Sequence, residues 1–323
     1  ATPVIGKPTR AGTWGAAFAW GYKNSGGDGR GHLYVLNANT GAPVLSGTDG
    51  AARASIATSA GSSATPSGLA KINAWVTSRS NNSIERIYGG DLEGNLWRFD
   101  FDNRVAPNQS AMLLAKLQIN TTTPQPITTK PELAKIDNQP VVMVGTGRYL
   151  GLSDINTTVQ QSVYAIKDRL TDAGWGDVRA NTTDFVQQTL SLASPSATSA
   201  TISDRAVNWA TKGGWWVDLP HARERVATNM ALLGGTLMVG SAIPSGDACT
   251  TGGSSWFYGL HATNGDVVTS NTPAGQQWSD PALIAGQTLV RDANGNRRNL
   301  VTDTAGNIRT QDVEGASSGL GSA

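Results

Sequence analysis

One short residue pattern constrains the fold more than any other feature of this sequence. From Glu85 to Asp102 the chain reads Glu-Arg-Ile-Tyr-Gly-Gly-Asp-Leu-Glu-Gly-Asn-Leu-Trp-Arg-Phe-Asp-Phe-Asp. Polar and apolar residues alternate on both sides of a Gly- and Asn-containing segment, which is typical of two half-buried strands joined by a tight turn. A hairpin this short is unstable alone in water, so it must pack against others like it. The pattern therefore predicts a repetitive, all-β protein.

The same pattern recurs along the chain and predicts five β-hairpins. In each, an apolar run leads through a polar segment to a second run with aromatic or β-branched residues. The paired segments are 14–21 with 32–41, 86–89 with 96–101, 141–145 with 162–168, 236–240 with 255–261, and 299–303 with 307–312. Equivalent positions lie further apart than the ~40–50 residues of ordinary propeller repeats. We therefore expect a modified, irregular β-propeller with loop insertions, one of them the Thr- and Ser-rich segment 180–212.

Composition and charge exclude several classes of function. Only 15% of the 323 residues are charged and the net charge is +1, whereas nucleic-acid binding needs clustered Lys and Arg. No apolar run approaches the roughly 18 residues that a membrane span needs. The single cysteine, Cys249, excludes an internal disulfide framework and leaves its own partner open. The many Ser, Thr and Asn residues, with few Lys and Glu, are typical of an exported protein.

No catalytic constellation can be assembled from the sequence. The three histidines are too scattered to suggest a zinc site, and none can be linked by sequence to a Ser and an Asp. The segment Asp292-Ala293-Asn294-Gly295-Asn296 has the alternating oxygen ligands of a calcium loop but lacks the closing acid. Asn294-Gly295 between two apolar runs instead favours a type I′ hairpin turn. We therefore expect a protein that is not an enzyme.

An ordered set of motifs resembles one known family. The set covers roughly residues 14–265 and includes the runs 86–100 (Arg-Ile-Tyr-Gly-Gly-Asp-Leu-Glu-Gly-Asn-Leu-Trp-Arg-Phe-Asp), 144–151 (Val-Gly-Thr-Gly-Arg-Tyr-Leu-Gly), 214–220 (Gly-Trp-Trp-Val-Asp-Leu-Pro), 224–226 (Glu-Arg-Val), 242–245 (Ala-Ile-Pro-Ser) and 249–256 (Cys-Thr-Thr-Gly-Gly-Ser-Ser-Trp). In this order they resemble the C-terminal β-propeller domain of the PilC/PilY family, the type IV pilus tip adhesin and biogenesis proteins.

The resemblance implies a modified propeller of about seven blades in the C-terminal part of a longer chain. We expect one propeller domain over residues 1–323 with a flexible tail at 313–323. The implied function is non-enzymatic: the domain supports pilus biogenesis by opposing retraction, and with it surface attachment and twitching motility. The implied partners are pilin or minor pilin subunits and a host or surface receptor. The implied location, after export, is the cell surface, the outer membrane or the pilus tip.

Members similar to this chain carry a calcium loop directly before the hairpin at 86–101. The corresponding positions here are Thr77, Arg79, Asn81 and Glu85. Asn81 and Glu85 keep an oxygen ligand, but Arg79 places a cation where Ca²⁺ needs an anion. We therefore expect a degenerate loop without metal, no cofactor, and no calcium control of retraction.

Two adjacent tryptophans are a candidate partner contact. Side chains alternate across a strand, so Trp215 and Trp216 point to opposite faces. One indole is expected in the core, and the other is free to contact a partner because aromatic anchors dominate interfaces.

Two other functions remain open at this point. The run Tyr34-Val35-Leu36-Asn37-Ala38-Asn39-Thr40-Gly41 is close to the repeat of pyrroloquinoline-quinone dehydrogenase propellers, but such enzymes need bound Ca²⁺ and often an adjacent Cys pair. A glycan-binding module is the third candidate, since Trp residues on propeller loops stack on sugars.

Overall fold

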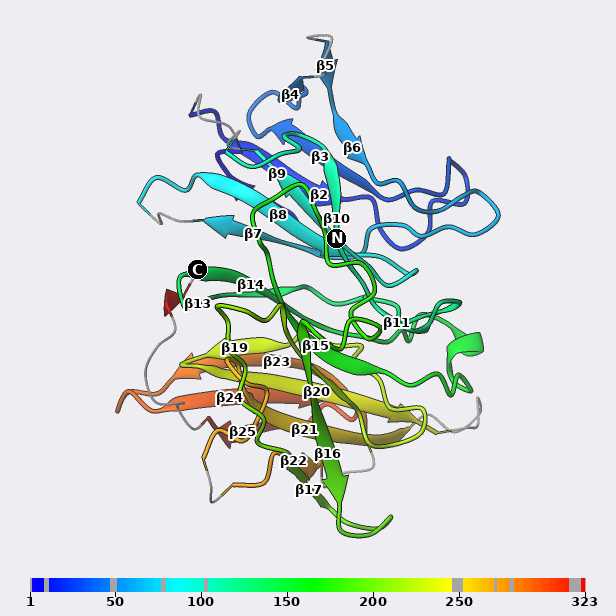
Figure 1. Ribbon diagram of the computed structural model, residues 1–323, viewed down its shortest axis with the longest axis vertical. Helices are drawn as coiled ribbons and strands as arrows, with labels where there is room; N and C mark the ends of the chain where they lie inside the picture. Colours follow the sequence, from blue (N-terminus) through cyan, green and yellow to red (C-terminus); the bar gives the residue numbers. More distant parts are fainter. Residues whose placement is uncertain are drawn as a thin grey trace. The chain divides into compact units, whose positions relative to one another are not determined.

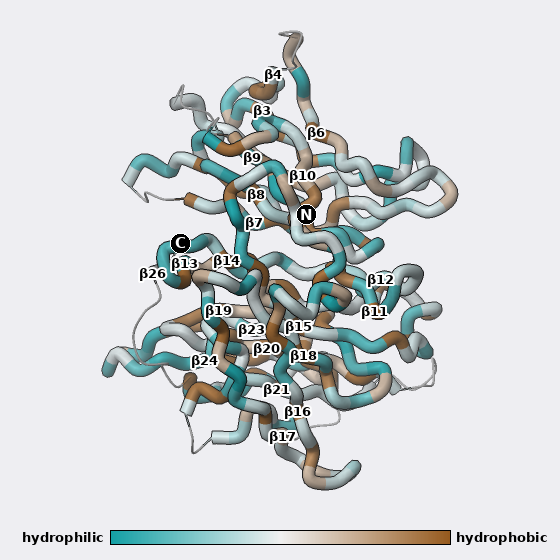
Figure 2. The backbone as a smooth tube through the Cα atoms, viewed as in Figure 1, coloured by the Kyte–Doolittle hydropathy of each residue, from teal (hydrophilic) through white to brown (hydrophobic). Residues whose placement is uncertain are grey.

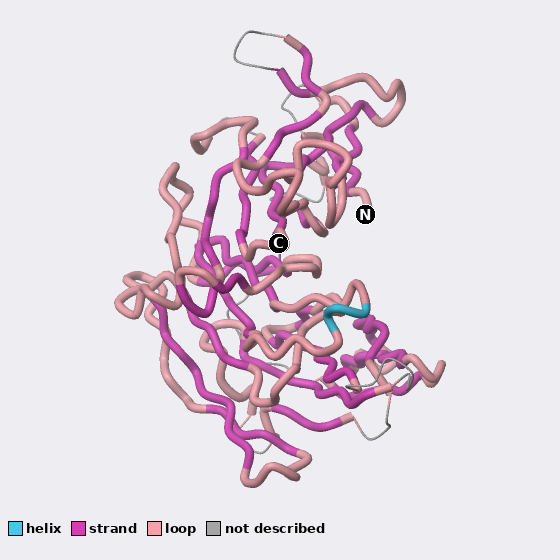
Figure 3. The backbone as a smooth tube through the Cα atoms, turned by 90° about the vertical axis from the view of Figure 1, so that its right-hand side faces the viewer, coloured by secondary structure: helices cyan, strands magenta, loops and turns pink. Residues whose placement is uncertain are grey.

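The structure is a computed structural model, and its described part consists of strands and loops with one short helix (Figures 1 and 3). The described residues are 2–8, 12–46, 51–76, 80–101, 104–245, 252–269, 272–278, 282–313 and 321–322. The helix, η1, is a single 3₁₀ turn at Leu152–Asp154. Among these residues, no helix has the length and apolar character to cross a membrane. Cys249 and part of the 249–256 motif fall outside the described residues.

The chain divides into two compact units, residues 1–133 with 168–181 and residues 134–167 with 182–322. The single-domain assignment stays a prediction. In the first unit two antiparallel sheets have four strands each. One has the order β1 (Val4–Gly6), β2 (Gly15–Ala19), β3 (His32–Asn37), β6 (Ser55–Ala57), and the other β10 (Ala111–Lys116), β9 (Asn95–Asp100), β8 (Ile84–Gly90), β7 (Ile72–Val76). Two short pairs join β4 (Leu45–Ser46) to β5 (Ala52–Arg53) and β11 (Gln118–Asn120) to β12 (Thr123–Pro124).

The second unit contains one long sheet and one three-stranded sheet. The long sheet has the order β19 (Ala231–Leu233), β20 (Thr236–Pro244), β21 (Gly253–His261), β22 (Gly275–Gln277), β17 (Ser199–Ile202), β16 (Phe185–Leu192), β18 (Gly214–Asp218), β15 (Ser162–Lys167), β14 (Gln139–Gly145), β13 (Glu132–Ile136), β26 (Gly321–Ser322). The three-stranded sheet has the order β23 (Ile284–Arg291), β24 (Arg297–Asp303), β25 (Ile308–Asp312).

All five predicted hairpins are confirmed by antiparallel registers. They are β2–β3, β8–β9, β14–β15, β20–β21 and β24–β25. Hydrophobic and hydrophilic residues are interspersed along the strands (Figure 2). In the first unit the return-strand aromatics Trp97 and Phe99 lie in the core. In the second unit the return-strand aromatics Trp256 and Tyr258 do the same, together with Trp215 of β18. The hairpin pattern thus identified strands that contribute to both cores.

Two expectations need correction. Strand β9 is buried along its whole length, as is β15, so these strands are covered on both faces and not half-buried. Segment 180–212 is not a loose insertion, because β16 pairs in parallel with β18 while β17 pairs with β22. The flexible tail at 313–323 stays a prediction, because residues 314–320 and 323 lie outside the described part; of the rest, Val313 is buried and β26 pairs with β13.

One turn motif, Asp-x-x-Gly-Asn, closes the hairpins β8–β9, β23–β24 and β24–β25, beginning at Asp91, Asp292 and Asp303. The first carboxylate oxygen of the Asp accepts two backbone N–H groups, and the second accepts the Asn side chain. The glycine of each turn has positive φ, which only glycine adopts at no cost. At Asp292–Asn296 the hairpin is confirmed but type I′ is wrong, since the Asp-held turn spans five residues between Arg291 and Arg297.

Two of these glycines give a matched test of what positions the turn. A Cβ on Gly94 would lie 2.2 Å from the carbonyl oxygen of Leu117, whereas a Cβ on Gly295 meets nothing within 4 Å. Gly295→Ala is expected to cost only the strain of positive φ, roughly 1 kcal/mol of unfolding free energy. Gly94→Ala adds a backbone clash and should cost roughly 3 kcal/mol or more. Urea unfolding of both variants measures the difference, and equal losses would contradict it.

Candidate functional site

The predicted calcium-loop residues are engaged by the protein itself. The Asn81 side-chain oxygen accepts the backbone N–H of Ser83 at 3.0 Å. The Glu85 carboxylate lies 3.1 Å from a guanidinium nitrogen of Arg86 and 3.8 Å from one of Arg104. Thr77 and Arg79 are outside the described residues. Arginine thus supplies positive charge at Glu85, and no group of three acidic, His or Cys side chains in the described part is placed to hold a metal.

Both candidate partner-contact tryptophans lie inside the second unit. Trp215 is fully buried and donates its indole N–H to the carbonyl of Ala262 at 3.0 Å. Trp216, on the opposite face of β18, is also buried, with its ring centroid 6.3 Å from that of Tyr164. Since both faces of β18 are covered, neither indole presents an open aromatic surface.

The Asp91 turn combines burial with many hydrogen bonds. The carboxylate accepts N–H groups from the backbone of Glu93 and Asn95 and from the side chains of Asn95 and Trp97, each at 2.9 Å. Burial raises the pKa of Asp91 to about 6, and the four donated hydrogen bonds limit the rise. At Asp292 burial acts in the same direction, but hydrogen bonds from Asn296 and Arg298 hold the pKa below its ordinary value. The same turn therefore titrates differently in different surroundings.

A buried ion pair fixes strand β9. Arg98 has no exposed surface and lies 2.8 Å from the carboxylate of Asp168. Its other terminal nitrogen donates to the carbonyls of Ala106 and Thr171. The Tyr88 hydroxyl donates to the second Asp168 oxygen at 2.7 Å, and burial, with Asp168, raises the Tyr88 pKa well above its usual range. This cluster joins the second hairpin to the segment that follows β15.

A second buried carboxylate, Glu224, gathers polar groups in the other unit. Its carboxylate accepts hydrogen bonds from Nδ1 of His221 at 2.8 Å and from the hydroxyl of Tyr258 at 2.7 Å. Ser241 donates to the same oxygen as Tyr258. The His221 ring centroid lies 4.6 Å from that of Trp256. Because Ser241 contacts the carboxylate and not the imidazole, these residues lack the order of a nucleophile, base and acid. Their role is to satisfy a buried charge.

Next to Glu224, Arg225 holds a surface loop in place. Its buried guanidinium donates to the backbone carbonyls of Arg148, Asp154, Thr157 and Arg223. Asp154, buried at the base of this loop, accepts from the Arg148 guanidinium at 2.7 Å and from the backbone N–H of Leu150 at 2.9 Å. A loop fixed by several charge-assisted hydrogen bonds has a well-defined shape.

This loop carries an exposed apolar surface. Tyr149, Leu150 and Leu152 project from it, and Leu152 is 74% exposed. We call residues 148–155 the apolar loop. Arg148 and Arg223 lie near its base and contribute positive charge. A rigid apolar loop with basic neighbours is suited to contact another protein, because little ordering entropy is lost on binding.

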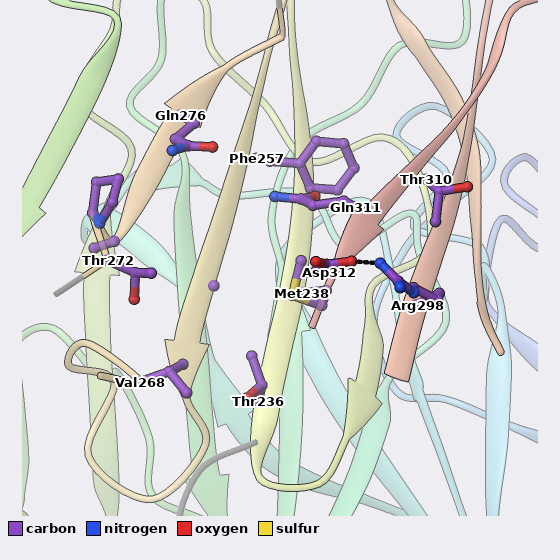
Figure 4. Close-up of a pocket in the computed structure, with 13 residues that line it drawn as sticks. Thr236, Met238, Phe257, Val268, Thr272, Gln276, Arg298, Thr310, Gln311 and Asp312 are labelled. Atoms are coloured by element: carbon purple, nitrogen blue, oxygen red, sulfur yellow. Dashed lines mark ion pairs between the residues drawn. The ribbon is translucent and has the colours of Figure 1, made fainter. Parts of the chain in front are cut away.

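A cavity of about 580 Å³ lies in the second unit between β20–β22 and β24–β25 (Figure 4). Its lining is part apolar, with Met238 and Phe257 as the largest side chains, and part polar, with three Thr and two Gln side chains. At one end Arg298 pairs with Asp312. The mixture of apolar and hydrogen-bonding groups is that of a ligand site without catalytic groups.

Sequence reasoning missed most of these features. The sequence does hint at the His221–Glu224 contact, since the two residues are three positions apart. A single His and Glu at this spacing is too common, however, to predict a site. The apolar loop only overlaps the 144–151 motif: Tyr149 and Leu150 belong to the motif, but Leu152 does not, and the sequence pattern does not show that any of them is exposed. The cavity and the Arg104–Glu85 contact depend on segments distant in sequence and have no local signal.

Comparisons with known proteins agree with this architecture. A family model described as the PilY1 beta-propeller domain matches residues 1–202. A type IV pilus biogenesis factor PilY1 homolog from Xylella fastidiosa is 27% identical over 287 residues, covering 81% of this chain and 18% of the relative. Type IV pilus biogenesis factor PilY1 of Pseudomonas aeruginosa is 28% identical over 247 residues, covering 64% of this chain and 21% of its own. The chain thus spans about a fifth of the length of these relatives.

A solved structure confirms the fold. The crystal structure of the Pseudomonas aeruginosa PilY1 C-terminal domain matches with a TM-score of 0.72 at 20% identity, covering 96% of this chain and 71% of that one. The predicted all-β propeller architecture is therefore correct.

The state of the degenerate loop leads to a metal-binding prediction. Because Glu85 is paired with arginine and Asn81 is used by the backbone, we expect no saturable Ca²⁺ binding at micromolar concentration. Isothermal titration of the purified chain measures this. Micromolar binding that disappears in Asn81→Ala would contradict the prediction, and the same titration on Asn120→Ala controls for a general loss of asparagine.

The Asp91 turn leads to a pH prediction. A carboxyl group with a raised folded pKa stabilises the fold fully below the unfolded value of ~3.9 and loses that contribution as pH rises through about 6. The unfolding free energy of the wild type relative to Asp91→Asn should therefore fall between about pH 4 and about pH 7, by up to ~3 kcal/mol. Asp292→Asn is the control, because a lowered pKa gives the opposite sign: that contribution is lost as pH falls. Parallel pH profiles for the two variants would refute the assignment.

Proposed function

This chain belongs to the PilY1 β-propeller family, and on that premise we propose that it is a non-enzymatic domain of a type IV pilus biogenesis factor. In this proposal the domain lies at the cell surface, the outer membrane or the pilus tip. There it contacts pilin or minor pilin subunits, opposes pilus retraction, and supports attachment and twitching motility. The family match over more than half of the chain is the observation that carries the proposal.

The apolar loop supports a role in contact with other proteins. Its side chains are exposed although Arg225 and Asp154 hold its backbone rigidly. Exposure of this apolar surface to water is unfavourable in free energy, and a partner that covers it would remove that cost. The buried clusters around Asp168 and Glu224 satisfy charges of the fold and offer no reactive group to a substrate. We therefore assign the function to surfaces and not to a catalytic centre.

Deletion of the parent gene tests the proposal. We expect surface pili to be lost in the deletion strain and restored when retraction is also disabled, because a factor that opposes retraction is needed only while retraction works. Counting sheared or imaged pili in both strains gives the result. Normal pili in the single deletion would refute the biogenesis role, and loss that persists without retraction would refute opposition to retraction.

Complementation with matched variants tests the apolar loop in the same strains. Leu152→Ser replaces the most exposed loop side chain, and Ile5→Ser replaces another exposed apolar residue, 55% exposed, on strand β1. Both substitutions are at the surface and should change stability by about 0.5 kcal/mol or less. If the loop contacts a pilus subunit, the first variant restores fewer pili than the second. Equal restoration would exclude the loop from that contact.

A further inference from the structure

The cavity in the second unit lies at the position of a fourth strand, which one sheet of this unit lacks. The strands before it form the run β19-β20-β21-β22, with β22 as the fourth strand. The next sheet, β23-β24-β25, has three, and among the described residues no strand pairs with the outer edge of β25. The cavity lies where a fourth strand would face β22: Gln276 of β22 lines one wall, and Thr310, Gln311 and Asp312 of β25 line another (Figure 4).

The backbone of β25 has hydrogen-bonding groups directed to this open edge. Val313 donates its backbone N–H to the carbonyl of Arg297, and Asp303 donates its backbone N–H to the carbonyl of Asn307. These two bonds show which residues of β25 face β24. In an antiparallel pair every second residue bonds to the neighbouring strand and the others point away from it. Ile308, Thr310 and Asp312 are therefore the residues whose N–H and C=O groups point outward. An extended chain is the structure whose spacing matches such a row.

Side chains on β25 indicate which residues such a chain would carry. Gln311 points toward Phe257 in Figure 4, and its buried side-chain oxygen has no hydrogen-bond partner among the described residues. A hydroxyl or amide donor opposite it would satisfy that oxygen. Arg309 places a cation on the same face, 5.3 Å from the Trp278 ring centroid, so an acidic residue across from it gives charge complementarity. On the other face Ile308 is 70% exposed and would be covered by an apolar residue.

We propose that the outer edge of β25 and the adjoining cavity bind an extended segment of another protein, which adds to the sheet as its fourth strand. The segment has an acidic residue opposite Arg309 and a small polar residue opposite Gln311. Its inward side chains enter the cavity beside Phe257 and Met238. This site is separate from the apolar loop and does not depend on a role in pili.

Two substitutions block the site by different means. A Cβ on Gly259, which lines the cavity, would lie 3.8 Å from Met238, so Gly259→Leu fills the cavity without a backbone clash. Thr310→Pro removes an N–H that points outward and leaves the β24 pairing intact, as proline is tolerated at a strand edge. Gly286→Leu is the matched control, because a Cβ there meets nothing within 4 Å and the residue does not line the cavity.

The probe is a phage-displayed library of random short peptides, selected on the purified full chain. Selected peptides should show the alternating pattern described above and bind wild type and Gly286→Leu equally. Their affinity should fall by about tenfold or more in both Gly259→Leu and Thr310→Pro. Hydrogen exchange of the amides of Ile308, Thr310 and Asp312 should be fast in the free chain and slow with bound peptide.

Four results would overturn the proposal. The first is a selection that yields no peptide whose affinity depends on both positions, and the second is a set of selected peptides that bind the two blocking variants as well as wild type. Slow exchange at the three amides of the free chain at every concentration would show that the chain itself covers the edge. Protection that appears only at high protein concentration and disappears in Thr310→Pro would identify a second copy of this chain as the occupant.

Discussion

The structure depends on strands that are covered on both faces, because a polar group buried on such a strand is costly unless it has a partner inside the protein. Arg98 is the extreme case. It alternates with Trp97 and Phe99 along β9 and so lies on the opposite face, which is also buried. The ion pair with Asp168 satisfies the charge, and Tyr88 takes the second carboxylate oxygen. Loss of one partner from such a pair typically costs 3–5 kcal/mol, since the other charge stays buried.

The same requirement explains why the recurrent motifs contain so many polar residues. Asp91 is buried, yet it is the acceptor for four N–H groups of its own turn. Glu224 does for its unit what Asp168 does in the other, with His221 and Tyr258 as donors. In a sequence, these residues look like candidates for chemistry. In the fold their side chains are hydrogen-bonded to groups of the protein itself. The residues that remain available to partners are apolar ones, such as Leu150 and Leu152.

This division explains how much the sequence could predict. The hairpins were predictable because strand alternation and Gly-containing turns are local, and all five predicted segment pairs are antiparallel strand pairs in the structure. The parallel pairing of β16 with β18 was not, since Thr- and Ser-rich strands have weak periodicity and their neighbours lie elsewhere in the chain. The burial of Trp216 was likewise unpredictable, because a strand pattern shows that faces alternate but not whether both are covered.

The incomplete sheet is where local pattern and fold diverge most. The hairpin β24–β25 follows the same sequence pattern as the other four, and nothing in its residues indicates that a fourth strand is missing. What distinguishes it is exposure: β25 is the one predicted return strand whose large apolar residue, Ile308, lies mostly in solvent among the described residues. Proteins usually protect such edges with charge, and β25 has Arg309 and Asp312 there, yet the cavity beside it remains open. An edge that is soluble alone and still able to pair is what reversible strand addition requires.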